Sequence, residues 1–394
     1  MKTFALLKSA LVVRQQEVKQ KLSHLPCSAT SQTNRQAITS SGKKVEKLLL
    51  DLLVNLRPRI EEQGHTHPDF ADIMAKLESL ATVALTSHSL RVLDCLNYMY
   101  EVCVDGSNAQ QADDNRYASF LELYNRALIR WIDRDATFEV PQLSDGKINR
   151  KTILLEINQP LRVAVVSSAI DSGLAMLNEI NEVEGVDAFL FLTIGRKQFS
   201  KSKMAHVRFM LLQIARMAYG IKQFPTLLQA ILRRRIVICM HHIASKTTTV
   251  KLRDMKFDVG IHGCDTIYRK HTISEFRLGI LNAHIGILPE YRGRAVAEWS
   301  ILNGHSNGIT TFFIDEGIDT GLTYLLRERT IVNETKSVIK LKQKLFKLRF
   351  SMCTQALKIL TKDGKAIQLE SSEYPRYFVM SHLLTSVANQ LVAL

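Results

Sequence analysis

From residue 161 onward, short apolar runs alternate with segments of helical periodicity, and this alternation constrains the fold more than any other feature. The apolar runs lie at 161–166, 187–193, 235–240 and 258–262. Helical patterns begin near residue 172 and recur at 206–219 and 226–234. Apolar strands that alternate with helices are typical of a parallel sheet with helices on both faces. The sequence therefore predicts a doubly wound α/β fold with a mostly parallel sheet.

The chain beyond residue 300 has a different pattern. Runs at 308–315 and 323–332 have no helical segment between them, which favours an antiparallel pair. Residues 336–360 and 381–394 have helical periodicity, and 368–377 looks extended. We therefore expect an α/β unit over 159–335 and a mainly helical C-terminal extension over 336–394.

The first part of the chain, residues 1–145, is helical in pattern and contains no recognisable catalytic constellation. We expect a separate helical domain of unknown role. Its start reads as an amphipathic helix rather than a signal peptide, although a targeting peptide stays open because acidic residues are scarce there. His65 and His67 alternate in a polar loop without an evident third ligand, so we expect no metal site.

Charge and cysteine usage limit the partners and the compartment. The formal net charge is +14, which attracts polyanions such as nucleic acid, anionic lipid or nucleotide-linked substrates. The basic residues are scattered, so nucleic acid ranks below a small molecule as a partner. Six cysteines without a Cys-x-x-Cys pair favour a reducing compartment, and no apolar run is long enough to span a bilayer. We therefore expect a cytoplasmic protein that does not bind membranes.

The most informative segment is 279–321. Asn282 and His284 are two residues apart at the end of an apolar run, so on a strand their side chains project from the same face. Asp319 lies in a second loop that directly follows another strand-like run. If the two loops meet, an amide, an imidazole and a carboxylate surround one cavity.

This set of groups suits the transfer of an acyl group to an amine. An amide can donate a hydrogen bond to the oxygen on which negative charge builds. An imidazole can stabilise the same oxygen or move a proton, and a carboxylate can orient the imidazole and accept a proton. Each fragment alone is more often ordinary turn chemistry, and only the combination in this order is specific.

The segment resembles the signature of the folate-dependent formyltransferase family, which includes methionyl-tRNA, sugar-nucleotide and glycinamide ribonucleotide formyltransferases and formyltetrahydrofolate deformylase. That signature reads Asn-x-His-x-Ser-Leu-Leu-Pro-x-Tyr/Trp-Arg-Gly, then Gly-x-Thr, then Asp-x-Gly-x-Asp-Thr-Gly. The matching residues here are Asn282, His284, Leu288, Pro289, Tyr291, Arg292, Gly293, Trp299, Gly304, Gly308, Thr310, Asp315, Gly317, Asp319, Thr320 and Gly321. The resemblance implies that Asn282, His284 and Asp319 form the catalytic triad of a Rossmann-like formyltransferase fold.

The resemblance also implies the substrates. The formyl donor would be 10-formyltetrahydrofolate, and the acceptor would be an amine, for example an amino sugar linked to a nucleotide. By analogy with the family, the folate pterin would lie against the backbone of two loops. The residues concerned are Gly263, Cys264, Asp265, Thr266, Asp315 and Gly317.

Some residues depart from the family pattern, and several alternatives stay open. The usual Pro-Ser after the histidine is Ile285-Gly286, which puts the path of that loop in doubt. The loop after the first strand, 167–173, lacks the glycine-rich pattern of glycinamide ribonucleotide enzymes, which disfavours that substrate.

A hydrolase with water as the acceptor needs the same groups, and a non-catalytic binding protein is a third interpretation. Arg292 either faces an anionic substrate or pairs with a carboxylate, and a homo-oligomer is among the possible assemblies.

Overall fold

The computed structural model describes residues 90–91, 94–98, 149–194, 207, 211, 224–264, 266–330, 337–370, 374 and 376–393. The helical domain predicted for 1–145 lies outside these residues except at 90–91 and 94–98. The helical pattern at 206–219 likewise lies outside them except at residues 207 and 211. No helix within the described ranges is long and apolar enough to cross a membrane.

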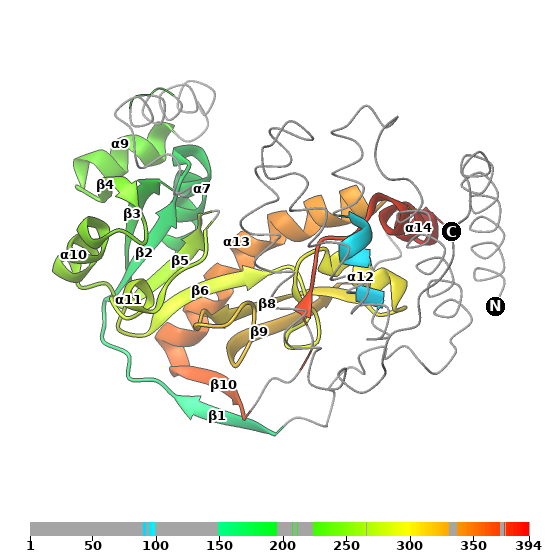
Figure 1. Ribbon diagram of the computed structural model, residues 1–394. Coiled ribbons are helices and arrows are strands. Elements are labelled where there is room, and N and C mark those ends of the chain that lie inside the picture. Colours follow the sequence, from blue (N-terminus) through cyan, green and yellow to red (C-terminus); the bar gives the residue numbers. More distant parts are fainter. Residues whose placement is uncertain are drawn as a thin grey trace, which may run out of the picture.

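Five parallel strands form one half of a nine-stranded sheet. Figure 1 shows how these strands are arranged. They are β2 (Leu161–Ser167), β3 (Val186–Ile194), β4 (Ile236–His242), β5 (Val259–Gly263) and β6 (Gly279–His284). Their order across the sheet is β4-β3-β2-β5-β6, and each neighbouring pair is parallel. β2, the first of these five strands along the chain, is therefore at the centre of the parallel half, and the predicted parallel core is confirmed.

The other half of the sheet is antiparallel. It continues from β6 through β8 (Asn307–Phe313), β9 (Thr323–Thr330), β10 (Lys365–Leu369) and β1 (Arg150–Leu154). All four of these pairings are antiparallel. The sheet as a whole is thus mixed rather than mostly parallel, because β8 and β9 are joined by a short loop and β1 and β10 add to the open edge.

Helices cover both faces of the sheet. The described helices from residue 170 onward are α7 (Ile170–Ile180), α9 (Phe224–Leu232), α10 (Lys246–Met255), α11 (Lys270–Ile273), α12 (Val296–Leu302), α13 (Val338–Asp363) and α14 (His382–Ala393), of which α14 packs mainly on α12. Alternate residues of β2 face opposite cores, as strand geometry requires: Val163 and Val165 pack with α7 and α13, whereas Ala164 and Val166 pack with Leu252 of α10. The predicted doubly wound arrangement therefore holds for the parallel half.

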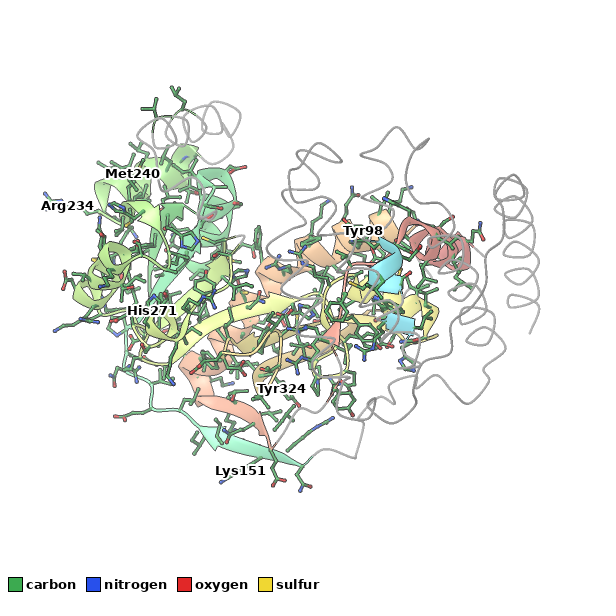
Figure 2. All side chains as sticks on the ribbon, in the orientation of Figure 1. Tyr98, Lys151, Arg234, Met240, His271 and Tyr324 are labelled. Carbon is green, nitrogen blue, oxygen red and sulfur yellow. The ribbon has the colours of Figure 1, made fainter. Side chains whose placement is uncertain are left out.

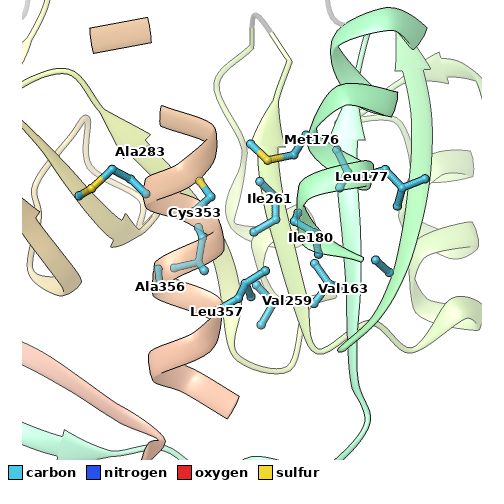
Figure 3. Close-up of a cluster of buried hydrophobic side chains, with 14 of the residues drawn as sticks. Val163, Met176, Leu177, Ile180, Val259, Ile261, Ala283, Cys353, Ala356 and Leu357 are labelled. Atoms are coloured by element: carbon cyan, nitrogen blue, oxygen red, sulfur yellow. The ribbon is translucent and has the colours of Figure 1, made fainter. Parts of the chain in front are cut away.

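The long helix α13 is part of this core. Its buried side chains recur at intervals of four or seven residues, which gives one apolar stripe: Leu341, Leu345, Met352, Ala356 and Leu360. Figure 3 shows Cys353, Ala356 and Leu357 of α13 beside Ala283 of β6 and Val259 of β5. The helix ends at Gly364, whose φ of 60° is the left-handed conformation typical of a helix end. Residues 338–369 thus add a helix and a strand to the same core, while the domain boundaries at 159–335 and 336–394 stay a prediction.

The described residues 90–91 and 94–98 pack against the C-terminal part of the chain. Asp94 is fully buried, and its carboxylate accepts hydrogen bonds from the Ser381 backbone N–H at 2.9 Å and from the Ser381 hydroxyl at 2.5 Å. The guanidinium of Arg91 donates to the Arg376 carbonyl and lies 5.4 Å from the centre of the Tyr377 ring. Tyr98, labelled in Figure 2, lies beside His382 at the start of α14, with 6.4 Å between ring centroids.

The buried carboxylate of Asp94 gives a test of this packing. We expect Asp94→Ala to lower the free energy of unfolding by about 1.5–3 kcal/mol, because two donors of Ser381 lose a charged acceptor. Urea denaturation measures this change. Glu370→Ala is the matched control: its exposed carboxylate also accepts one hydrogen bond, from Asn149 at 2.9 Å, and its loss should cost less than about 0.5 kcal/mol. Equal effects of the two substitutions would contradict the packing described.

Candidate active site

The last residues of β6 lie where the sheet changes from parallel to antiparallel pairing. β6 pairs with β5 only as far as Ile261–Leu281, whereas its pairing with β8 continues to His284–Thr310. Asn282 is therefore the first residue of β6 without a partner on β5. Ligands of open α/β sheets bind at the carboxyl ends of strands near such a change in strand order. Asn282 and His284, 9% and 8% exposed, thus lie at the edge where a substrate is expected.

The imidazole of His284 is fixed by different partners at its two nitrogens. Nε2 lies 2.9 Å from the Tyr291 carbonyl oxygen, and Nδ1 lies 3.7 Å from Oδ2 of Asp319. A carbonyl oxygen can only accept, so Nε2 is the nitrogen that donates. Nδ1 is therefore the nitrogen whose protonation can change, and it faces a carboxylate.

Asp319 lies in a loop, residues 314–322, that is held in place by its own side chains. The carboxylate of Asp315 accepts hydrogen bonds from the Gly317 N–H at 2.7 Å and from the Thr320 hydroxyl. Asp319 itself has a φ of 45°, in the left-handed region that Asp and Asn adopt more readily than other residues with a side chain. Such backbone strain persists where the surroundings over-determine it, and it is common at functional sites.

Arg292 joins this loop to the loop that follows β6. Its guanidinium donates to the Ile318 carbonyl oxygen from Nε at 3.1 Å and from Nη2 at 2.8 Å. From the sequence we expected Arg292 to face an anionic substrate or to pair with a carboxylate, and we did not predict this contact with a backbone carbonyl. The motif arginine thus anchors the backbone of the residue that precedes Asp319.

The loop that follows His284 is held by Thr310 of β8. The Thr310 hydroxyl donates to the Gly286 carbonyl at 2.8 Å and accepts from the Leu288 N–H at 3.0 Å. A Cβ at Gly286 would lie 2.5 Å from the Tyr291 carbonyl oxygen and 2.8 Å from Nε2 of His284. The glycine that departs from the family pattern therefore leaves room for the hydrogen bond that orients His284.

A second arginine stabilises the same loop. Glu290 is fully buried, and its two carboxylate oxygens accept from Nη2 of Arg327 on β9 at 2.7 and 2.8 Å. A buried carboxylate without its partner is strongly destabilising, so this pair holds the loop close to β9.

The structure brings together the three residues predicted to be catalytic. Asn282 and His284 project from β6, and the loop after β8 places Asp319 beside His284. Their chemical roles remain a prediction. Within the described ranges, no group of three or more His, Cys, Asp or Glu residues is arranged to hold a metal ion.

The residues predicted to line a pterin pocket lie at or after the ends of β5 and β8, and several of them have structural contacts. A Cβ at Gly263 would lie 2.8 Å from the Val166 carbonyl oxygen, so glycine is required there for strand packing. Cys264 is 3% exposed, and Thr266 Oγ1 lies 3.2 Å from Nε2 of His242. Gly317 lies in the loop that Asp315 holds, and Asp265 lies outside the described residues. Their role in folate binding remains a prediction.

Two polar residues at this edge were not found by sequence reasoning. His262, at the end of β5, lies with Nδ1 3.3 Å from the Tyr268 hydroxyl. Burial, and to a lesser extent the nearby Arg349 guanidinium, together lower the pKa of His262 to about 3, so the ring is neutral at neutral pH. Arg349 reaches the site from α13, with Nη2 3.4 Å from Oδ1 of Asn282. A histidine that ends an apolar run was a usable signal for His262, whereas Arg349 had none.

Comparison with known proteins shows what this part of the chain resembles. Residues 244–357 match the family described as Formyl transferase, so this segment is similar to members of that family. The methionyl-tRNA formyltransferase of Caldanaerobacter subterraneus subsp. tengcongensis is 39% identical over 97 residues, which is 24% of this chain and 30% of that protein. The methionyl-tRNA formyltransferase of Flavobacterium psychrophilum is 43% identical over 86 residues, 22% of this chain and 26% of that protein. The chain thus matches less than a third of the length of these relatives.

Solved structures were compared as well. A 4-N formyltransferase from Francisella tularensis aligns with 60% of this chain and 88% of its own, at 17% identity and a TM-score of 0.40. A phosphoribosylglycinamide formyltransferase from Bacillus halodurans aligns with 51% of this chain and 96% of its own, at 17% identity and a TM-score of 0.36.

The close contacts that a side chain at Gly286 would make give a prediction about this site. We expect Gly286→Ala to lower the free energy of unfolding by about 1–3 kcal/mol, the usual cost of overpacking, and to shift the imidazole NMR signals of His284. Gly304→Ala is the control, because its added Cβ meets no atom within 4 Å although φ is 70°. It should cost about 1 kcal/mol from backbone strain alone and leave the His284 signals in place. Unchanged His284 signals in Gly286→Ala would show that the glycine is not needed there.

Proposed function

We propose that this chain is a folate-dependent N-formyltransferase, which moves a formyl group from 10-formyltetrahydrofolate to an amine. The observation that carries the proposal is the His284–Asp319 pair, with 3.7 Å between Nδ1 and Oδ2, next to Asn282 at the end of β6. The match of residues 244–357 to the formyl transferase family supports it.

Asn282 would stabilise the charge that develops during transfer. Attack by the amine nitrogen on the formyl carbon forms the new C–N bond and places negative charge on the formyl oxygen. A side-chain N–H aimed at that oxygen lowers the barrier because the interaction strengthens as the charge grows. Asn282 is nearly buried, where such a hydrogen bond is stronger than in water.

His284 and Asp319 would manage the proton. The attacking amine must lose a proton, and the bond from the formyl carbon to the donor nitrogen breaks as that nitrogen gains one. Nε2 of His284 is held by the Tyr291 carbonyl, so Nδ1 is the position that can take up and return a proton. Asp319 faces Nδ1 and stabilises the charged imidazolium while the proton is held there.

The substrates would bind across the carboxyl edge of the parallel strands. The end of β5 and the loop after β8 flank Asn282, and their backbone would contact the pterin at Gly263, Cys264, Asp265, Thr266, Asp315 and Gly317. For the acceptor we propose a nucleotide-linked amino sugar, because the net charge of +14 favours an anionic substrate and the scattered basic residues rank nucleic acid below a small molecule.

Turnover of the unmodified protein tests the function directly. The assay follows the loss of formyl-folate with an amino-sugar nucleotide, methionyl-tRNA, glycinamide ribonucleotide, or no acceptor. Amine-dependent loss supports the transferase, and equal loss with water alone would make the protein a hydrolase. No loss with any acceptor, from protein that binds formyl-folate, would contradict both reactions.

Removal of the amide donor should slow the reaction without weakening donor binding. We expect Asn282→Ala to lower kcat about 100- to 1000-fold, the usual loss for one such donor, while the Kd for folate changes little. Steady-state kinetics and isothermal titration measure the two quantities. Asn181→Ala, at the exposed C-terminal end of α7, is the matched control and should leave both unchanged. A kcat for Asn282→Ala at the wild-type level would remove Asn282 from the mechanism.

Neutralising Asp319 should change the pH dependence of the rate. Asn adopts a φ of 45° as readily as Asp does, so Asp319→Asn removes the charge and keeps the loop. We expect a lower kcat and the loss or displacement of one limb of the kcat–pH profile, because an acid–base partner is missing. Glu316→Gln, an exposed residue of the same loop paired with Lys270 at 2.8 Å, is the control and should keep the wild-type profile. If Asp319→Asn also kept that profile, Asp319 would have only a structural role.

A further inference from the structure

Arg349 is a charged residue next to the apolar stripe of α13. Leu345, Met352 and Cys353 on the neighbouring turns are all buried in the sheet-facing core. Arg349 itself is half-buried. Taking a guanidinium out of water is costly unless its donors find partners. A leucine or methionine would suit this helix better, so the contacts of Arg349 explain why a charge is present.

The main polar contact of Arg349 is with Asn282. Nη2 of Arg349 lies 3.4 Å from Oδ1 of Asn282, and the guanidinium also lies 5.5 Å from the centre of the Phe346 ring. β5 no longer pairs with β6 at Asn282. The side chain of Arg349 therefore reaches the end of β6, beyond the last residue that pairs with β5.

The chemistry of the two groups sets the direction of the amide. A guanidinium has only donors, whereas a primary amide has an acceptor at Oδ1 and two donors at Nδ2. The stable arrangement turns Oδ1 toward Arg349, which directs Nδ2 away from α13. An asparagine without such a partner can rotate its amide by 180° and present its oxygen to a developing oxyanion, which would be repulsive.

The charge of Arg349 interacts with two other ionisable groups near Asn282. Burial lowers the pKa of the guanidinium and the carboxylate of Asp319 acts in the opposite direction, while Arg349 contributes to the low pKa of His262. The positive charge therefore lies among Asn282, Asp319 and His262.

We propose that Arg349 is a positioning residue that holds the Asn282 amide with its Nδ2–H groups toward the reacting carbonyl. The proposal rests on the function proposed above. It adds a residue outside the 279–321 motif to the machinery of the reaction and assigns that residue a defined partner.

Kinetics of Arg349 variants provide the first test. Arg349→Met keeps an apolar stem and removes every donor. We expect kcat to fall about 10- to 100-fold with little change in the KM for formyl-folate. A misdirected Asn282 amide would lose part of its stabilisation of the oxyanion, whereas Asn282→Ala removes that stabilisation completely. In Asn282→Ala, the same Arg349→Met substitution should lower kcat less than threefold, since the amide it orients is gone. Additive losses would overturn the proposal.

Chemical rescue separates positioning from a general effect on the fold. Guanidinium chloride at millimolar concentration should restore part of the kcat of Arg349→Ala, whereas sodium chloride at the same concentration should not. Two controls are Asn282→Ala and Arg253→Ala, the latter because the exposed Arg253 pairs with Glu275 away from the amide. Guanidinium chloride should raise the kcat of neither variant. An equal rise for Arg253→Ala, or none for Arg349→Ala, would count against the proposal.

A measurement without turnover keeps this proposal distinct from the proposed function. The side-chain amide signals of Asn282 in ¹⁵N-labelled protein are identified by their loss in Asn282→Asp. We expect two resolved N–H signals in the wild type and faster averaging or solvent exchange of both in Arg349→Met. Unchanged signals would refute the positioning role even in an active enzyme. Changed signals in a protein that transfers no formyl group would uphold the contact and refute the proposed function alone.

Discussion

The site depends on one constraint, which is that β6 has neighbours of opposite direction on its two sides. Parallel pairing with β5 stops at Leu281, while antiparallel pairing with β8 continues to His284. The end of β6 is thus supported by backbone hydrogen bonds on one side and open on the other. Rigid strands place side chains more accurately than loops do, so Asn282 and His284 gain fixed positions at the carboxyl end of β6.

The matched motif residues act on this strand end largely through backbone contacts. Thr310 holds the carbonyl of Gly286 and the N–H of Leu288, and Arg292 holds the carbonyl of Ile318. Asp315 closes the loop that presents Asp319. The motif is therefore a set of residues that shape two loops around a few reactive groups, and this explains why it extends over some forty positions rather than three.

Much of the parallel half followed from the sequence, because strands buried on both faces are continuous apolar runs. The runs at 161–166, 187–193 and 258–262 became β2, β3 and β5. The helix α10 escaped notice because only Thr248, Thr249 and Leu252 of its residues are buried, which leaves almost no apolar stripe. β1 is short and mostly exposed, and Arg349 reaches Asn282 from 67 positions away. Contacts of that kind follow from the tertiary fold, and local patterns do not contain them.

The two different partners of His284 also determine how the ring can handle a proton. Nε2 is bound to a backbone carbonyl and Nδ1 faces a carboxylate. A half-turn of the ring would break the first contact and put carbon atoms where the nitrogens now lie. In the proposed reaction, the ring would therefore not take up a proton at one nitrogen and release it at the other. Nδ1 would serve both steps, so the proton would leave toward the side from which it arrived.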